Sequence, residues 1–130
     1  MKKLYTAISL QGANQSRARE AIYSLLLDAN DVLSVSELSS LLVDTYPKKI
    51  SQNTLYRHLN FFIDNNLVIV LQDNHKRAYY YLSSDECLYF SLCTVCNAIH
   101  KVDIDKSKDT SFLEAQYITL HKKCNICKSK

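Results

Sequence analysis

The stretch ISQNTLYRHLNFFIDNN, residues 50–66, has the pattern of a helix that buries one face. Three apolar side chains recur at helical spacing and are expected to pack inward: Leu55, Leu59 and Phe62. Ser51 is a favourable N-terminal cap, because its hydroxyl can accept a hydrogen bond from the first turn. Asn66 can adopt the left-handed conformation that closes a helix. We therefore predict a helix that begins after Ser51 and closes at Asn66.

Two further helices are predicted upstream of this stretch. Residues 16–29, SRAREAIYSLLLDA, carry apolar residues at helical spacing. The next helix begins at Ser34, because SVSE places Glu37 three residues later and so forms a capping box. This helix ends at Tyr46, since the residue before a proline is driven out of the helical conformation.

A β-hairpin is predicted after the third helix. The runs LVIVL (67–71) and RAYYYL (77–82) are β-prone, and Asp73 with Asn74 supplies the turn between them. Three helices followed by a hairpin are typical of a winged helix-turn-helix, in which the third helix is the recognition helix and the hairpin is the wing. We therefore assign residues 1–83 to a winged-helix domain.

The outward face of the third helix carries the side chains that a reader of the DNA major groove needs: Asn53, Thr54, Tyr56, Arg57 and Asn60. The hairpin tip adds three groups suited to the adjacent phosphates: His75, Lys76 and Arg77. A solvated polar face is the alternative interpretation. The net charge of +3 is spread along the chain, so charge alone only weakly favours an anionic partner.

Two CxxC pairs stand in the remaining part of the chain: Cys93, Cys96, Cys124 and Cys127. Four thiolates can enclose one Zn²⁺ in a closed tetrahedral site, which has a structural role because no position stays open for water. A redox pair and two disulfides are the alternatives. Disulfides are disfavoured because the sequence shows no signal peptide or membrane span, so we expect a cytoplasmic protein.

Residues 84–130 are predicted to form a second, small domain. LYFSLC (88–93) and NAIHKVDI (97–104) alternate like strands, residues 106–111 read as a loop, and another strand begins at Tyr117. So short a segment buries little core, and a metal would stabilise it by contributing its binding energy to folding. The predicted fold class is α+β.

The whole pattern resembles the ferric uptake regulator family of bacterial metal-dependent repressors. The segments that carry the resemblance run nearly from end to end: RAREAIYSLL, SVSELSSLL, ISQNTLYRHLNFFIDNNLV, YYYL, CTVCNAIH and CNIC. The resemblance implies a homodimer with an N-terminal winged helix and a C-terminal α/β dimerisation domain clamped by one structural zinc per protomer. It also implies binding to an AT-rich inverted repeat in double-stranded DNA. Tyr56 and Arg57 match the DNA-contacting pair of the family.

Departures from the family pattern concern its regulatory metal site. The positions of the usual His and Glu ligands fall at about Val32, at Tyr81 and within residues 87–90, and a further family His falls near Gln116. Valine, leucine and phenylalanine cannot ligate a metal, so we predict that the conventional regulatory site is absent. The family's basic contacts with the minor groove are not clearly matched, and Lys2, Lys3 and Arg17 are the candidates.

A replacement sensor would have to use Cys87 or the histidines, of which we consider His75, His100 and His121. We expect His100 to be a packed, hydrogen-bonded strand residue and Cys87 to be a small buried hydrophobe rather than a ligand. His121 lies three residues before Cys124 and can be a solvated group, a hydrogen-bond donor to a thiolate, or a ligand.

The functional hypothesis is a sequence-specific DNA-binding regulator, acting as a repressor. One alternative is a regulator switched by oxidation of the zinc thiolates or of Cys87. Another is a partner that forms heterodimers with a second family member and modulates it. The sequence does not indicate an enzyme. It contains no recognisable arrangement of catalytic residues, and one glycine cannot build a glycine-rich phosphate-binding loop.

Overall fold

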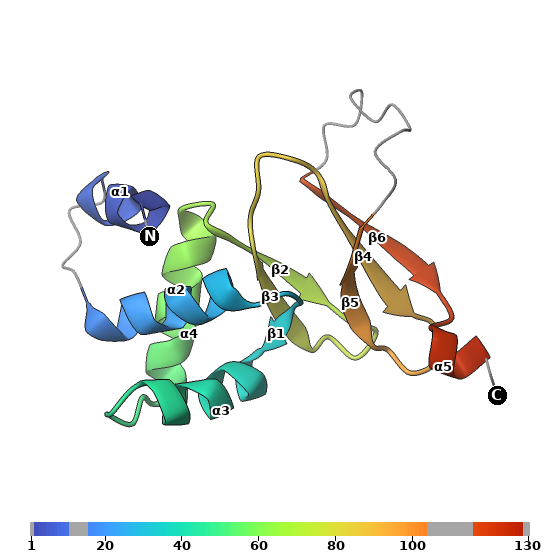
Figure 1. The fold of residues 1–130 in the computed structure, drawn as a ribbon, viewed down its shortest axis with the longest axis horizontal. Helices are drawn as coiled ribbons and strands as arrows, with labels where there is room; N and C mark the ends of the chain where they lie inside the picture. The colour runs from blue at the N-terminus through green and yellow to red at the C-terminus, as the bar shows by residue number, and fades with distance from the viewer. Residues whose placement is uncertain (1, 11–15, 104–115, 129–130) are drawn as a thin grey trace.

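The computed structural model describes residues 2–10, 16–103 and 116–128. Its helices and strands follow in the order α1 (Lys2–Leu10), α2 (Arg17–Asp28), β1 (Leu33–Ser34), α3 (Val35–Thr45), α4 (Gln52–Asp64), β2 (Val68–Gln72), β3 (Ala78–Leu82), β4 (Leu88–Cys93), β5 (Ile99–Val102), β6 (Tyr117–Lys122) and α5 (Asn125–Lys128). The predicted loop over 106–111 lies outside the described residues. Figure 1 shows the first four helices at one end and the second sheet with α5 at the other.

The predicted helix starts are confirmed by their caps. The side chain of Ser16 accepts a hydrogen bond from Arg19 N, and that of Ser51 accepts one from Thr54 N. Ser34 and Glu37 form the complete capping box, with hydrogen bonds of 3.1 and 3.2 Å. These caps satisfy backbone N–H groups that have no partner within the helix, which is why polar residues there fix where each helix begins.

Helix closure at Asn66 is also confirmed, because this residue has a φ of 58°. The helix itself ends at Asp64, and the chain then turns directly into β2. A short polar side chain tolerates the left-handed region better than a branched one, so asparagine suits this tight connection.

Helix α1 is not predicted from the sequence. Its inward residues Leu4, Ala7 and Ile8 are buried in the same cluster as α2, α3 and α4. Nine residues are too few for a stable isolated helix, and no acidic residue stands in the first turn. The helix therefore depends on tertiary packing, which local sequence signals do not report. The two-residue strand β1 is missed for the same reason.

The strands form two three-stranded sheets with the orders β1-β3-β2 and β5-β4-β6. The first sheet is antiparallel and contains the wing. In the second sheet β4 pairs antiparallel with β5 and parallel with β6. The parallel pair joins segments that are far apart in sequence, because β5 runs back along β4 before β6 begins.

The wing sheet is covered on both faces. Val68 and Tyr80 pack into the helical core. On the opposite face the wing contributes to a second apolar cluster, which consists of Val32, Ile69, Leu71, Phe90, Leu92 and Ile99, with Tyr79, Tyr81 and Leu88 packed against it. This second cluster, the junction cluster, joins the wing to the β5-β4-β6 sheet. Alternation along β2 and β3 thus sends successive side chains into two different cores.

Helix α4 is tied to α2 through a histidine that the sequence analysis did not single out. His58 is 7% exposed, and its Nδ1 accepts a hydrogen bond of 3.2 Å from Arg19 Nε. The Arg19 guanidinium also lies 3.9 Å from the centroid of the Phe61 ring. Burial lowers the pKa of His58 from its ordinary 6.5, and the charges of Arg19 and Arg57 lower it further. His58 is therefore held neutral, with its proton on Nε2.

This lowered pKa predicts a loss of stability in acid. Below about pH 6.5 the unfolded chain protonates His58 more readily than the folded chain, so the free energy of unfolding falls as the pH falls toward the folded-state pKa. His58→Gln retains an acceptor for Arg19 but does not titrate. Urea denaturation between pH 7.5 and 5.5 should show a smaller drop for the variant than for the wild type. Equal drops would contradict this prediction.

Candidate functional site

Helix α4 presents the polar face that the sequence predicts. Asn53, Tyr56, Arg57 and Asn60 are exposed, while Leu55, Leu59 and Phe62 are buried at 1% exposure or less. Thr54 differs from its neighbours because it is half-buried and its Oγ1 accepts a hydrogen bond of 2.9 Å from the Ser51 hydroxyl. Thr54 thus completes the start of the helix, and the four exposed side chains are the ones presented to a partner.

The wing tip is organised around one buried carboxylate. Asp73 is 5% exposed and accepts hydrogen bonds from His75 N at 2.8 Å, Arg77 N at 3.0 Å and Arg77 Nε at 2.9 Å. Burial raises the pKa of Asp73, but the hydrogen bonds from Arg77 and His75 outweigh this effect and hold the pKa below 3.8. Asp73 therefore stays ionised and fixes the loop.

The predicted wing cations differ in whether a carboxylate holds them. The guanidinium of Arg77 is held by Asp73, although its side chain remains 62% exposed. Lys76 is exposed and has a φ of 62°, which places it at the outermost bend of the hairpin, next to the exposed His75. Lys76 is thus the more available cation of the wing.

The remaining candidates for DNA contact come from the N-terminal part. Arg17 is exposed at the first residue of α2. Lys3 is exposed on α1, and its Nζ lies 4.0 Å from Asp85 Oδ1. The side chain of Lys2 lies outside the part that can be described. Lys3 therefore faces the connection between β3 and β4, and Arg17 lies two residues before Arg19, which makes the α2–α4 contact.

The four cysteines of the two CxxC pairs come together at one end of the second sheet. Their sulfur atoms all lie within 4.8 Å of one another. Cys93 Sγ and Cys127 Sγ are 3.7 Å apart, and Cys96 Sγ and Cys124 Sγ are 3.8 Å apart. A disulfide needs about 2.05 Å, so these distances exclude bonds between the sulfurs. Four ligands at about 2.3 Å from a tetrahedral Zn²⁺ would be about 3.8 Å apart, which matches both pairs.

Backbone N–H groups stabilise the thiolate form of one of these cysteines. Cys93 Sγ accepts hydrogen bonds of 3.4 Å from the backbone N–H groups of Val95, Cys96 and Cys124. Those from Cys96 and Cys124 contribute most to lowering the pKa of Cys93 to about 5. Cys93 is also the least exposed cysteine, at 2%. A thiolate stabilised by backbone donors is one of the ligands that a zinc ion binds in structural sites.

Four of the positions at which the resemblance places regulatory ligands lie in or beside the junction cluster: Val32, Tyr81, Leu88 and Phe90. Val32 and Phe90 are 6% and 0% exposed, and Leu88 and Tyr81 pack against them. The Tyr81 and Phe90 rings meet edge to face with centroids 5.4 Å apart. Apolar atoms therefore occupy the space at these positions.

The four sensor candidates, Cys87, His75, His100 and His121, do not form a group that could share an ion. Cys87 is half-buried and not fully buried as expected, and its sulfur lies 3.7 Å from Leu88 O. His121 is exposed on β6. Among the described residues, the four cysteines are the only group of three or more potential ligands close enough to share an ion.

The expectation that His100 is packed is wrong, although the expected hydrogen bond is present. Its side chain is 58% exposed, and Nδ1 lies 2.8 Å from Asp31 Oδ2. The strand pattern did not show that Ile99, rather than His100, faces the junction cluster, or that this edge of β5 meets the turn after α2. His58 was missed, although its position three residues after Leu55 puts it on the inward face of α4.

Comparisons with known structures show the same fold. The ferric uptake regulator of Helicobacter pylori is 21% identical, with a TM-score of 0.79 over 99% of this chain and 91% of that one. The regulator of Pseudomonas aeruginosa with manganese is 15% identical, with a TM-score of 0.75 over 93% and 97% of the two chains. Comparison with curated protein sequences gives no significant match.

Two further findings bear on the class of protein. No helix in the described ranges is long and apolar enough to cross a membrane. The profile of the Ferric uptake regulator family matches residues 11–125. Since this match spans most of the sequence, the chain belongs to the ferric uptake regulator family, whose members are transcription regulators and not enzymes.

Proposed function

We propose that this chain is a cytoplasmic, homodimeric repressor that binds a specific DNA sequence and holds a structural zinc ion. The observation that carries the proposal is the exposed polar face of α4, on which Asn53, Tyr56, Arg57 and Asn60 stand clear of the core. In a winged helix this face enters the major groove, where arginine pairs with guanine and asparagine with adenine. Lys76 at the wing tip is suited to an adjacent phosphate.

A homodimer would present two copies of α4 to the two halves of an inverted repeat. The second sheet supports this arrangement, because β6 is an edge strand with Tyr117 and Leu120 exposed at 36% and 38%. Exposed apolar side chains along an open strand edge favour pairing with another chain. An AT-rich operator is expected from the family, and a dimer seated on a promoter would block transcription.

The zinc would be held by Cys93, Cys96, Cys124 and Cys127. The separations of their sulfur atoms fit the edges of a tetrahedron, and Cys93 is poised as a thiolate. When bound, the ion supplies cross-linking and charge neutralisation, not chemistry on a substrate. It would join the end of β4 to α5 and so stabilise the small second sheet.

We also propose that DNA binding does not respond to a regulatory metal. The junction cluster would hold the wing against the second sheet continuously, whereas a metal would do so only when bound. Each fully buried aliphatic or aromatic side chain contributes about 1.5–3 kcal/mol. Six such residues outweigh an exposed ion pair such as Asp31–His100, which contributes about 0–1 kcal/mol.

A second candidate is a redox-switched regulator. Cys96 is exposed, so an oxidant can reach one of the four sulfurs directly. Loss of zinc after oxidation would loosen the second sheet and separate the dimer. Under this alternative, DNA binding depends on the redox state of the protein and recovers after reduction and addition of zinc.

Arg57→Ala should weaken binding to DNA selected by the protein from a random pool by about 1–3 kcal/mol, because a base or phosphate contact is lost. Lys101→Ala removes an equal charge from β5 and should leave binding nearly unchanged. Fluorescence anisotropy measures both affinities, and sedimentation checks that both variants remain dimers. Equal affinities for Arg57→Ala and the wild type would contradict the assigned role of α4.

Cys93→Ser should remove the zinc and unfold the second part of the chain, because metal-binding energy of about 10–16 kcal/mol is folding energy in small metal-stabilised units. Cys87→Ser is the matched control and should retain one zinc per chain. Elemental analysis and limited proteolysis measure the two effects. A Cys93→Ser protein with a full zinc content would disprove the four-cysteine site.

Addition of Fe(II) or Mn(II) to the zinc-loaded protein should change its affinity for the selected DNA by less than about twofold, or about 0.4 kcal/mol. The physical reason is that apolar side chains fill the positions of the regulatory ligands. Metal analysis after gel filtration should show no second equivalent. A second bound metal that strengthens DNA binding would overturn the proposed metal independence.

A further inference from the structure

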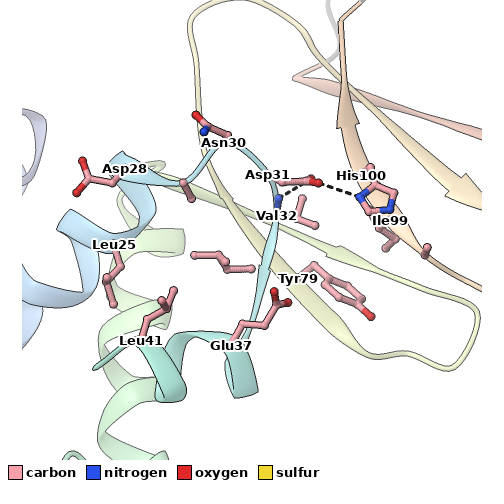
Figure 2. A pocket seen from close by; sticks show the side chains of 13 residues that line it. Leu25, Asp28, Asn30, Asp31, Val32, Glu37, Leu41, Tyr79, Ile99 and His100 are labelled. Carbon is pink, nitrogen blue, oxygen red and sulfur yellow. Dashed lines mark hydrogen bonds and ion pairs between the residues drawn. The ribbon is translucent and has the colours of Figure 1, made fainter. Parts of the chain in front are cut away.

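A pocket of about 580 Å³ lies where the two halves of the chain meet. Figure 2 shows side chains from α2, from the turn before β1, from α3, from β3 and from β5 around it. Its volume is in the range of small-molecule sites, about 300–1,000 Å³. Of the positions of the conventional regulatory ligands, only Val32 lines the pocket, so the pocket shares one residue with that site.

The pocket has an apolar interior. Its apolar lining residues are Leu25, Ala29, Val32, Leu33, Leu41, Tyr79, Ala98 and Ile99. Leu41 is 39% exposed, and Leu25, Leu33 and Tyr79 are half-buried. These side chains still contact water, so an apolar molecule that covers them would gain hydrophobic free energy in proportion to the area removed from water.

The charged groups around this interior are mainly acidic. Asp28, Asp31 and Glu37 line the pocket, while none of its lining residues is a lysine or an arginine. His100 is the basic group among them, and it is paired with Asp31. Burial is the main cause that raises the pKa of Tyr79; the charges of Asp73 and Glu37 raise it further, and that of Arg77 lowers it. The pocket therefore favours a positively charged ligand.

We propose that this pocket binds a small organic cation with an apolar body, such as an aryl-alkyl amine. The body would lie against Leu33, Leu41 and Tyr79. The ammonium group would lie toward Glu37 and Asp31, whose carboxylates Figure 2 shows on two sides of the pocket. Apolar contact would supply most of the affinity, and charge would select amines over neutral or acidic analogues.

Binding here would act on the contact between the two halves. Asp31 Oδ1 accepts hydrogen bonds of 2.7 Å from both Val32 N and Lys101 N, and Asp31 Oδ2 pairs with His100 at 2.8 Å. An ammonium group beside Asp31 competes with His100 for the same carboxylate. Because this exposed ion pair contributes about 0–1 kcal/mol, the amine would loosen only the local attachment of β5 to the turn after α2 and change the DNA affinity by up to about fivefold. This last step rests on the proposed function, whereas binding itself does not.

Calorimetry on the full, zinc-loaded chain tests the binding with 2-phenylethylamine as the probe and 2-phenylethanol as its neutral counterpart. We expect one saturable site per chain and binding of the amine that is about fivefold tighter than that of the alcohol, as one ion pair of about 1 kcal/mol predicts. Glu37→Gln preserves the capping box. It should lower the affinity for the amine and leave the affinity for the alcohol unchanged.

Two arginine variants on the same helix show where the probe binds. Leu41→Arg places a cation in the pocket and should lower the affinity for the amine at least about tenfold. Val43→Arg, at a position that is 80% exposed and outside the pocket, should leave the affinity unchanged. Absence of saturable binding at about 10 mM amine, equal affinity for the alcohol, or equal losses in the two variants would overturn the proposal.

A DNA-binding titration separates this proposal from the proposed function. An amine that binds by calorimetry and shifts the affinity for the selected DNA supports both the pocket and its coupling. An amine that binds while the protein recognises no DNA supports the pocket and overturns the proposed function. An amine that binds and leaves a measurable DNA affinity unchanged supports the ligand site and overturns its competition with His100.

Discussion

Burial of the β2–β3 hairpin on both faces is the constraint on which the rest of the structure depends. One face completes the helical core through Val68 and Tyr80, and the other packs against β4 and β5 through Ile69 and Leu71. A hairpin so placed cannot swing freely without exposing apolar side chains from two cores. The position of the recognition helix relative to the cysteine cluster therefore follows from packing across a shared sheet.

Much of the fold could be predicted because its start and stop signals are local. Ser16, the Ser34–Glu37 box and Ser51 each satisfy backbone groups within a few residues, and the apolar spacing of α4 reports its buried face directly. Helix α1, strand β1 and the contact of Asp31 with β5 could not be predicted, because each depends on segments that are distant in sequence. The same limit explains why His100 is exposed when its strand pattern indicated a packed residue.

The four ligands of the candidate metal centre could be predicted from the sequence, but their hydrogen bonds and exposure could not. Two CxxC pairs indicate four sulfurs around one ion, and the structure brings those sulfurs together. Spacing alone does not show that Cys93 accepts three backbone hydrogen bonds or that Cys96 is the most accessible member. For the candidate DNA contacts, the sequence indicates a basic wing tip. It does not show that Arg77 donates a hydrogen bond to Asp73, which depends on the folded loop.

The parallel pairing of β4 with β6 has a consequence for how the chain folds. Its partners, from Leu88 with Tyr117 to Cys93 with Lys122, are separated by a long stretch of chain, so the pairing must close a large loop before it gains any contact. Cys93 is the last residue of β4, and the other three cysteines follow the ends of these two strands. An ion bound early in folding by all four cysteines would hold the ends of β4 and β6 together and so speed their pairing. The supply of zinc during synthesis would then set how quickly newly made chains reach the native state.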